Sequence, residues 1–367
     1  MHVIHIYKTY FPDTHGGVER VIYNLTRYTS KQGIKNTIVT VAKKPGIHYK
    51  EGVKIIQLPL SFEYASCPIS LSLFQQYHDV LSEADILHYH APWPYADFCH
   101  MIKGINKPTI LTYHSDIIAQ KWLKIPYQLL FHAFMKKVDS IIATSHPYLE
   151  SSRDLAPYQH KTKVIPIGID PTAYPSLDMA LVNKWRTQVE EGFALFIGVL
   201  RYYKGLKYLL QALKDTQIPL VIAGSGYLNE SLKKQTKQLG LNKVNFVGQI
   251  SEEDKIALLY LSGVFITPSH LRSEAFCIGL LEALMMGKPL ISCEIGTGTS
   301  FINQHKQTGL IIPPANPAAI QNALQTILTN SVLAKDFGKA SKERFDQYFT
   351  IDNMGEKYME EYQRLFS

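Results

Sequence analysis

The sequence predicts an α/β protein built from two doubly wound domains. Short apolar β-rich runs alternate with amphipathic helical patterns along the chain, which is typical of parallel sheets covered by helices on both faces. The chain has 367 residues, more than the roughly 250–300 residues at which a single core stops growing. Near the middle, Gly168, Pro171 and Pro175 interrupt the periodicity and separate the two halves.

Each half repeats the same plan of strand and helix. The first half contains predicted strands at 3–7, 37–41, 53–58, 86–90, 109–113, 140–144 and 163–166, with helices at 18–31, 70–81 and 127–137. The second half contains predicted strands at 194–199, 220–223, 244–247, 264–267, 289–293 and 309–312, with helices at 206–214, 229–239, 254–260, 279–286 and 318–328. A last helix at 353–366 has no strand after it.

These patterns give the expected domain organisation. We expect a first domain over residues 1–168, a linker over 169–185, a second domain over 186–345 and a C-terminal helix over 346–367.

Composition excludes several classes of protein. A hydrophobic fraction of 46% excludes a disordered or collagen-like chain. The net charge of +7 favours anionic partners, but the basic residues form no dense stripe of the kind that binds nucleic acid. Four scattered cysteines without a C-x-x-C motif indicate neither a disulfide framework nor a zinc site and suit a reducing compartment. Residues 1–7 resemble a strand rather than a signal peptide, and no apolar run approaches the roughly 20 residues of a membrane-spanning helix. We therefore expect a cytoplasmic protein that is soluble or peripheral to a membrane.

The most informative motif contains two glutamates, Glu274 and Glu282, separated by seven residues. Eight residues of helix rise about 12 Å, more than the ~5–9.5 Å between the paired carboxylates of glycoside hydrolases. The glutamates are better placed to hold two ends of one elongated polar ligand, with the backbone amides of Phe276, Cys277 and Ile278 facing a phosphate at a helix N-terminus. The alternative is that both are ordinary surface charges. The apolar residues around Glu282 argue against it, because an unpaired buried carboxylate is costly.

This motif resembles the Glu-x7-Glu signature of the retaining glycosyltransferases of family 4. Their fold is GT-B, in which two Rossmann-like domains face each other across a cleft. The resemblance extends over nearly the whole chain and includes the segments 16–17, 201–205, 223–226 and 244–248. The segment 292–300 is similar to bacterial enzymes that build mannose or D-rhamnose polysaccharides of the O-antigen type from GDP-sugars. One departure concerns the donor phosphate: Ala275-Phe276-Cys277 stands where the family usually has Gly-Phe-Gly, so Cys277 adds a side chain there.

The resemblance implies a role for each matching residue of the second half. Glu274 would bind hydroxyls of the donor sugar and Glu282 the ribose. Arg201 and Lys204 would neutralise the diphosphate, and two cations on one loop suit the charge that grows on a departing nucleoside diphosphate. The remaining donor-binding residues would be Gly224, Val247, Phe276, Cys277 and Ile278.

The resemblance also assigns residues in the first half. Gly16 and Gly17 would allow the backbone to approach the donor diphosphate closely. His114 would be a catalytic residue that contacts the donor sugar, at the end of a strand where open parallel sheets bind ligands. Asp13, Glu19 and His90 are candidate acceptor contacts. The C-terminal helix would pack back on the first domain.

We expect no cofactor and no metal. No two aspartates are two positions apart, so the Asp-x-Asp metal motif of other glycosyltransferases is absent from the sequence, and no His, Cys or Asp cluster has metal-ligand spacing.

Residues 120–137 mix aromatic, aliphatic and basic side chains at helical spacing. Lys121, Lys124, Lys136 and Lys137 would suit an interfacial helix on anionic lipid. The alternative is an ordinary helix that covers the sheet.

The expected function is that of a retaining glycosyltransferase that moves a mannose-like hexose from a nucleotide sugar, GDP-mannose, to a saccharide or lipid-linked glycan acceptor. The open alternatives are a UDP-sugar donor, a sugar-nucleotide epimerase or phosphorylase of the same architecture, and a non-catalytic nucleotide-sugar-binding subunit of a polysaccharide assembly complex.

Overall fold

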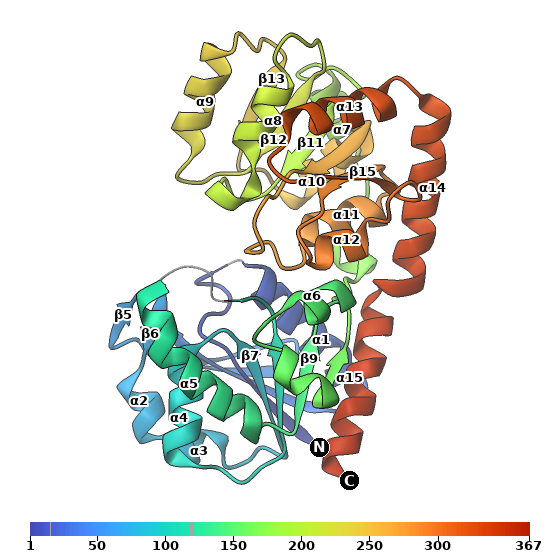
Figure 1. Ribbon diagram of the computed structural model, residues 1–367. Helices are drawn as coiled ribbons and strands as arrows, with labels where there is room; N and C mark the ends of the chain where they lie inside the picture. The colour runs from blue at the N-terminus through green and yellow to red at the C-terminus, as the bar shows by residue number, and fades with distance from the viewer. Residues whose placement is uncertain (15, 117–120) are drawn as a thin grey trace. The chain divides into compact units, whose positions relative to one another are not determined.

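The computed structural model describes residues 1–14, 16–116 and 121–367, apart from the side chains of residues 121–126. Its contacts divide the chain into two compact units (Figure 1). The first contains Met1–Ile169 and Ile351–Ser367, and the second contains Asp170–Thr350. The expected linker at 169–185 therefore belongs almost entirely to the second unit. It ends in the helix α7 (Met179–Arg186), which packs against α10 (Glu252–Leu261) because Val182 and Trp185 are buried.

The first unit contains an eight-stranded sheet among its described residues. The strand order is β10 (Thr162–Val164), β9 (Ser140–Ala143), β8 (Thr109–Tyr113), β7 (Ile86–Ala91), β1 (His2–Ile6), β2 (Lys35–Ala42), β4 (Val53–Pro59) and β3 (Gly46–Lys50). β1, β7 and β8 are buried along their whole length, as expected of central parallel strands covered on both faces. Among the eight described strands of this sheet only the edge strand β3 runs antiparallel, and it closes a hairpin with β4 through Glu51 and Gly52, both at positive φ.

Helices and a small hairpin also belong to the described part of the first unit. They are α1 (Gly17–Lys31), α2 (Leu71–Gln75), α3 (Tyr77–Leu81), α4 (Pro94–Lys103), α5 (Lys121–Lys137), α6 (His146–Ser151), the 3₁₀ helix η1 (Ala156–Lys161), and the hairpin strands β5 (Phe62–Tyr64) and β6 (Cys67–Ile69). The segment predicted as one helix at 70–81 is two short helices separated at Gln76.

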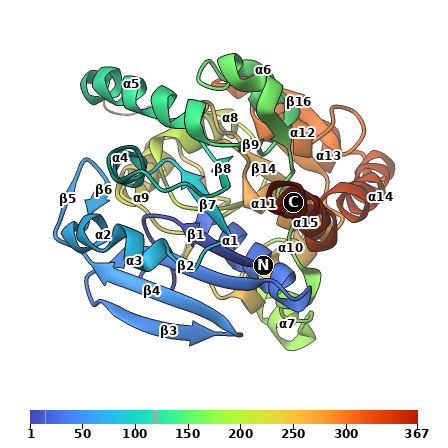
Figure 2. The same cartoon turned by 90° about the horizontal axis from the view of Figure 1, so that it is seen from below.

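The C-terminal helix α15 (Ile351–Phe366) belongs to this unit and lies beside α1 (Figure 2). Gly355 permits the close approach, because a Cβ there would lie 2.1 Å from the ring of Tyr28. Tyr358 and Tyr362 are buried and bond to side chains of β8 and β7. The last helix is therefore an integral layer over the first sheet.

The second unit contains a six-stranded parallel sheet among its described residues. Its order is β13 (Val244–Gly248), β12 (Leu220–Ala223), β11 (Ala194–Ile197), β14 (Val264–Thr267), β15 (Leu290–Cys293) and β16 (Gly309–Ile312). Besides α7 and α10, the other elements are α8 (Leu206–Ala212), α9 (Asn229–Gln238), α11 (Ile278–Met285), α12 (Gly298–Ile302), α13 (Pro317–Leu328), α14 (Ser331–Tyr348), and the 3₁₀ turns η2 (Pro171–Ala173) and η3 (Tyr202–Lys204). The two units are thus doubly wound α/β domains, as the sequence predicts.

Candidate active site

In the second sheet the strand order reverses between β11 and β14, which are neighbours in space but not in sequence. The loops that follow these two strands leave the same edge of the sheet in opposite directions. Such a switch point is where open α/β sheets bind ligands, because the two loops diverge there. The loop after β11 carries Arg201 and Lys204, and the loop after β14 carries Glu274.

Backbone contacts hold these two loops together. The amide of His270 donates to the carbonyl of Tyr203 at 2.9 Å. Gly205 adopts φ +71, and a Cβ there would lie 2.0 Å from the carbonyl oxygen of Pro268. Glycine is therefore required at position 205 for both its conformation and its space. This close contact positions the preceding residue, Lys204, beside the second loop.

Lys204 and Glu274, 70 positions apart in sequence, form a buried ion pair. Lys204 Nζ donates to Glu274 Oε2, which also accepts a hydrogen bond from Ser269 Oγ at 2.8 Å. Burial alone would lower the pKa of Lys204, but the neighbouring Glu274 carboxylate outweighs it and raises the pKa above its usual value. The lysine therefore stays charged in a water-poor site. Arg201 lies three residues earlier and is exposed, immediately before η3.

Cys277 directly precedes α11 and takes φ +72, a conformation that glycine adopts freely and other residues adopt at a cost. The departure from Gly-Phe-Gly therefore leaves a glycine-like backbone conformation in place. Burial, assisted by the Glu274 charge, raises the pKa of the Cys277 thiol to about 11, so the thiol stays protonated. Phe276 is buried, and Ile278 begins α11.

The segment that resembles GDP-sugar enzymes lies against the same loop. The amide of Gly298 donates to the carbonyl of Ala275 at 2.8 Å, and Arg272 Nη1 donates to the carbonyl of Gly296 at 2.8 Å. A Cβ on Gly298 would lie 2.5 Å from the ring of Phe276. The fold thus brings the 292–300 segment to the residues next to Glu274.

Glu282, on α11, forms a second buried ion pair, with Lys255. Its Oε1 accepts from Lys255 Nζ at 2.5 Å and from the hydroxyl of Tyr174 at 3.1 Å. Glu282 is 6% exposed and Lys255 7%. The sequence interpretation missed both partners. Lys255 lies three positions after Glu252, a spacing typical of ion pairs on the surface of a helix. The apolar residues around Lys255 in α10 are the one sequence signal that its side chain is buried.

Gly224 and Val247 lie on the β12 and β13 side of the switch point. Gly224 has φ +128, and a Cβ there would lie 2.0 Å from the carbonyl oxygen of Gly198. The loops after β11 and β12 therefore touch through their backbones at this glycine. Val247 is a half-buried residue of the edge strand β13.

In the first unit, the loop after β1 leads to Gly16 and Gly17 at the start of α1. The Glu19 carboxylate accepts hydrogen bonds from Thr9 Oγ1 at 2.8 Å and Thr14 Oγ1 at 2.6 Å. It lies over Gly16, where a Cβ would come within 2.3 Å of it. Glu19 is buried and engaged in shaping this loop, whereas the other candidate acceptor contact there, Asp13, is exposed.

At the switch point of the first sheet, where β1 and β7 are neighbours, the rings of four histidines contact one another: His5, His88, His90 and His114. His114 follows β8, and its Nε2 lies 3.0 Å from Nδ1 of His90. Nε2 of His90 lies 3.1 Å from Nδ1 of His5. His90 is thus buried with both ring nitrogens engaged by other histidines, which leaves neither free for a direct acceptor contact.

His88 shares this cluster but bonds elsewhere. Its Nε2 contacts Thr112 Oγ1 at 2.7 Å, and its Nδ1 contacts the hydroxyl of Tyr362 at 2.7 Å. Ring nitrogens of His5, His88 and His90 come within 4.8 Å of one another, a spacing that the sequence did not reveal. Each ring also makes hydrogen bonds within the protein, as expected of a structural cluster.

The candidate membrane segment is described only in part: residue 120 and the side chains of residues 121–126, including Lys121 and Lys124, lie outside the described residues. In the remainder of α5, Phe131, Phe134 and Met135 are buried, which matches an ordinary helix that covers the sheet. Leu129 is 76% exposed, and Lys136 and Lys137 are exposed. No helix among the described residues is both long and apolar enough to cross a membrane.

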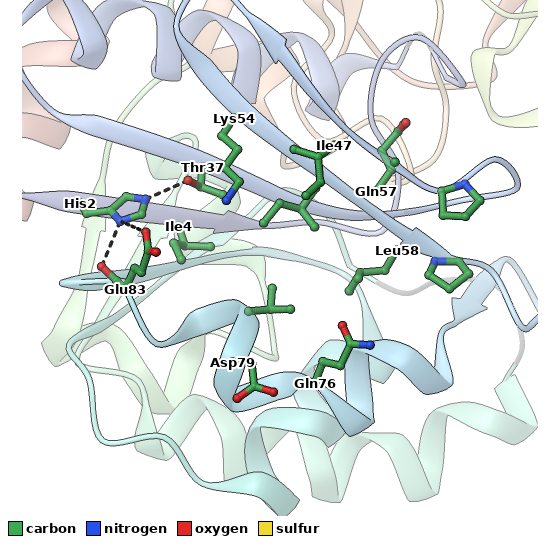
Figure 3. A pocket seen from close by; sticks show the side chains of 15 residues that line it. His2, Ile4, Thr37, Ile47, Lys54, Gln57, Leu58, Gln76, Asp79 and Glu83 are labelled. Carbon is green, nitrogen blue, oxygen red and sulfur yellow. Dashed lines mark hydrogen bonds and ion pairs between the residues drawn. The ribbon is translucent and has the colours of Figure 1, made fainter.

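A groove of about 420 Å³ lies elsewhere on the first sheet, on the face covered by α2 and α3 (Figure 3). His2 forms part of its wall and contacts Thr37 Oγ1 at 2.8 Å and the carbonyl of Glu83 at 3.0 Å. None of the residues predicted for the active site lines it. The groove is therefore separate from the switch-point site.

Comparison with known proteins agrees with this geometry. The family model described as glycosyl transferases group 1 matches residues 180–344, and that of glycosyltransferase family 4 matches residues 15–173. The chain is 44% identical to D-rhamnosyltransferase WbpZ of Pseudomonas aeruginosa over 95% of this chain and 92% of the relative. It is 42% identical to O-antigen chain mannosyltransferase C of Escherichia coli over 100% and 99% of the two chains.

Among solved structures, sucrose-phosphate synthase from Thermosynechococcus elongatus superimposes with a TM-score of 0.83 at 21% identity, covering 100% of this chain and 99% of that one. This likeness concerns the fold alone.

Together these findings define a glycosyltransferase of the GT-B fold. More specifically, the chain belongs to the family 4 glycosyltransferases. The predicted family, fold class and enzyme class are confirmed.

Proposed function

We propose that this enzyme is a retaining hexosyltransferase that transfers a mannose-like sugar from a GDP-sugar to a growing cell-surface polysaccharide of the O-antigen type. The observation that carries the proposal is the buried Lys204–Glu274 pair at the switch point, in a chain 42% identical to an O-antigen chain mannosyltransferase. The acceptor is a saccharide or a lipid-linked glycan.

The second unit would hold the donor. The Glu274 carboxylate, held by Lys204 and Ser269, is a fixed acceptor for donor-sugar hydroxyls. The Glu282 carboxylate, fixed by Lys255 and Tyr174 in the same way, would accept from the ribose hydroxyls. Fixed acceptors of this kind bind well because they need no reorganisation when the ligand arrives.

Arg201 and Lys204 would stabilise the diphosphate as it departs. Lys204 is buried and charged, so its field acts strongly on a neighbouring phosphate. Arg201 is exposed on the same loop and can form paired hydrogen bonds to phosphate oxygens. These two cations would do what a divalent metal does in other transferases, and we propose that the reaction needs no metal or cofactor.

The configuration at the anomeric carbon would be retained because the acceptor hydroxyl attacks this carbon from the same face that the diphosphate leaves. In this proposal the departing phosphate helps to deprotonate the acceptor hydroxyl, and the protein supplies position and electrostatic stabilisation. Trapping of a covalent glycosyl-enzyme with a slow donor analogue would refute it.

The decisive experiment measures release of nucleoside diphosphate from GDP-mannose and from UDP-sugars, with and without a saccharide acceptor. We expect acceptor-dependent release from the GDP-sugar in the wild type and a loss of at least about a hundredfold in Glu274→Gln, the scale of a lost transition-state contact. Ser231→Ala, on the exposed face of α9, is a surface control. Preference for UDP-sugars would overturn the donor assignment. Conversion of the donor without acceptor and without net release of nucleoside diphosphate would favour an epimerase, and binding without turnover would favour a non-catalytic subunit.

We also propose that the enzyme works in the cytoplasm, against the inner face of the membrane. Its four cysteines are free thiols, which suits a reducing compartment. Leu129, Lys136 and Lys137 are exposed on α5 and could meet anionic lipid. Co-sedimentation with vesicles containing anionic phospholipid should fall in the Lys136→Glu, Lys137→Glu double variant, and unchanged binding would contradict the membrane contact.

A further inference from the structure

Three histidine rings and one amide form a continuous hydrogen-bonded chain inside the first unit. His114 Nε2 contacts His90 Nδ1 at 3.0 Å, His90 Nε2 contacts His5 Nδ1 at 3.1 Å, and His5 Nε2 contacts Asn36 Oδ1 at 3.2 Å. Neighbouring rings are nearly parallel, at 19° and 20°. This row of hydrogen bonds, called the histidine relay below, leads from β2 through β1 and β7 to the end of β8, across the switch point.

Asn36 has one permitted orientation. Its Nδ2 faces the carbonyl oxygens of Thr26 at 3.3 Å and Ile34 at 3.2 Å, which only accept hydrogen bonds. It also faces Ser30 Oγ at 2.9 Å and Thr29 Oγ1 at 2.9 Å, and the proton of Thr29 Oγ1 is donated to the carbonyl of Leu25. An amide turned the other way would place its oxygen against the two carbonyl oxygens and Thr29 Oγ1, none of which has a proton to give it. Asn36 must therefore present its oxygen to His5, and His5 Nε2 must carry a proton.

That single constraint passes along the chain when the rings are neutral. A neutral imidazole carries one proton, so a protonated Nε2 leaves Nδ1 as an acceptor. His5 Nδ1 then requires a proton on His90 Nε2, and His90 Nδ1 requires one on His114 Nε2. Burial lowers the pKa of both His5 and His114 to about 3, and burial first, then the neighbouring histidines, lowers the pKa of His90 well below its usual value. All three rings are therefore neutral at physiological pH.

We propose that Asn36, His5 and His90 are positioning residues that fix the tautomer of His114, so that its Nδ1 is always a hydrogen-bond acceptor. Among the described residues Nδ1 of His114 has no hydrogen-bond partner, and the ring is 6% exposed. A fixed lone pair in a water-poor position suits a ligand hydroxyl, which must donate to it, and disfavours a ligand group that only accepts. The identity of that hydroxyl as one of the donor sugar rests on the proposed function.

The relay has a direct spectroscopic signature. In protein labelled with ¹⁵N-histidine, we expect nitrogen–nitrogen couplings across the His114–His90 and His90–His5 hydrogen bonds, and unprotonated Nδ1 signals for all three rings. These measurements need no substrate. Absence of either coupling, or a protonated Nδ1 on His114, would overturn the proposal.

Two substitutions of His90 distinguish the effect of its hydrogen bond to His114 from the effect of its packing. His90→Asn places an oxygen near the former Nδ1 and can still accept from His114, whereas His90→Phe keeps the ring volume but cannot accept. We expect kcat/KM to fall about tenfold in His90→Phe, as for loss of one well-placed hydrogen bond, and to stay within about threefold of the wild type in His90→Asn. Equal losses in the two variants would overturn the relay.

His88→Phe is the matched control, because His88 lies on the same strand and is equally buried but bonds to Thr112 and Tyr362. The His114 signals should remain unchanged in it, and their displacement to the protonated Nδ1 form would count against the relay. If the couplings are present but His114→Ala retains full transfer activity, the relay stands and the proposed role of His114 in transfer fails.

Discussion

Lys255 provides the sharpest test of the second buried ion pair. Its ammonium group lies 2.5 Å from Glu282 and 2.7 Å from Glu252, and both Lys255 and Glu282 are more than nine-tenths buried. Lys255→Met would leave the Glu282 carboxylate buried without its cation. Removing one partner of a buried pair costs about 3–5 kcal/mol, because the remaining charge loses its compensation while still lacking water.

This loss is large enough to see by thermal unfolding. For a unit of the size of Asp170–Thr350, 1 kcal/mol shifts Tm by about 2–4 °C, so Lys255→Met should lower the Tm of this unit by roughly 6–20 °C. Differential scanning calorimetry of the full chain measures the shift. The affinity for GDP, measured by calorimetric titration, should fall as well if Glu282 must be held in place to bind ribose.

Two further variants make this prediction refutable. Adding Glu282→Gln to Lys255→Met removes the buried charge while keeping an acceptor for Tyr174, so most of the lost stability should return. Lys243→Met removes an exposed pair with Glu190 at 3.0 Å and should cost no more than about 1 kcal/mol. A Tm for Lys255→Met within about 2 °C of the wild type, or strictly additive effects in the double variant, would refute the reasoning.

Three other predictions follow from single features. Because Cys277 holds φ +72, Cys277→Gly should be more stable than Cys277→Ala by about 1 kcal/mol in thermal unfolding, the reverse of the usual order; a more stable alanine variant would contradict the strain. Burial opposes ionisation of Glu361, but its bonds to Arg364 and Lys163 outweigh this and lower its pKa to about 2. Because this pKa is lower in the folded protein than in the unfolded chain, ionised Glu361 stabilises the fold at pH values above its unfolded pKa. This contribution should be lost as the pH falls from about 4.5 towards 2, and the stability of Glu361→Gln should depend less on pH in this range. Finally, transfer activity should survive dialysis against EDTA, and its abolition would show that a metal is required.

The sequence predicted the class of the fold because strand–helix alternation is a local property. The apolar run of β1 and the amphipathic pattern of α1 are legible residue by residue. The elements it missed depend on context. Gln76 divides one helical pattern into two helices, and β3 forms only because Glu51 and Gly52 turn the chain back on β4.

The residues of the candidate site also fall into those that the sequence predicts and those that it does not. Glu274, Glu282 and Lys204 stand in motifs, so the sequence could propose them as a set. Their partners could not be found in this manner, because Lys255 lies 27 positions and Tyr174 lies 108 positions from Glu282. Nothing local in the sequence fixes which lysine reaches a buried carboxylate.

The histidines of the first unit show most clearly which features the sequence predicts and which only the tertiary structure decides. The sequence alone determined a family 4 glycosyltransferase of two α/β domains, with His114 at a strand end and His90 on the preceding strand. Only the tertiary structure decided that His90 is hydrogen-bonded to both His114 and His5, and that Asn36 is the last member of this row of hydrogen bonds. The physical reason is that hydrogen-bond direction depends on which groups the parallel strands bring into register, and that register is set by packing across the sheet rather than by neighbours along the chain.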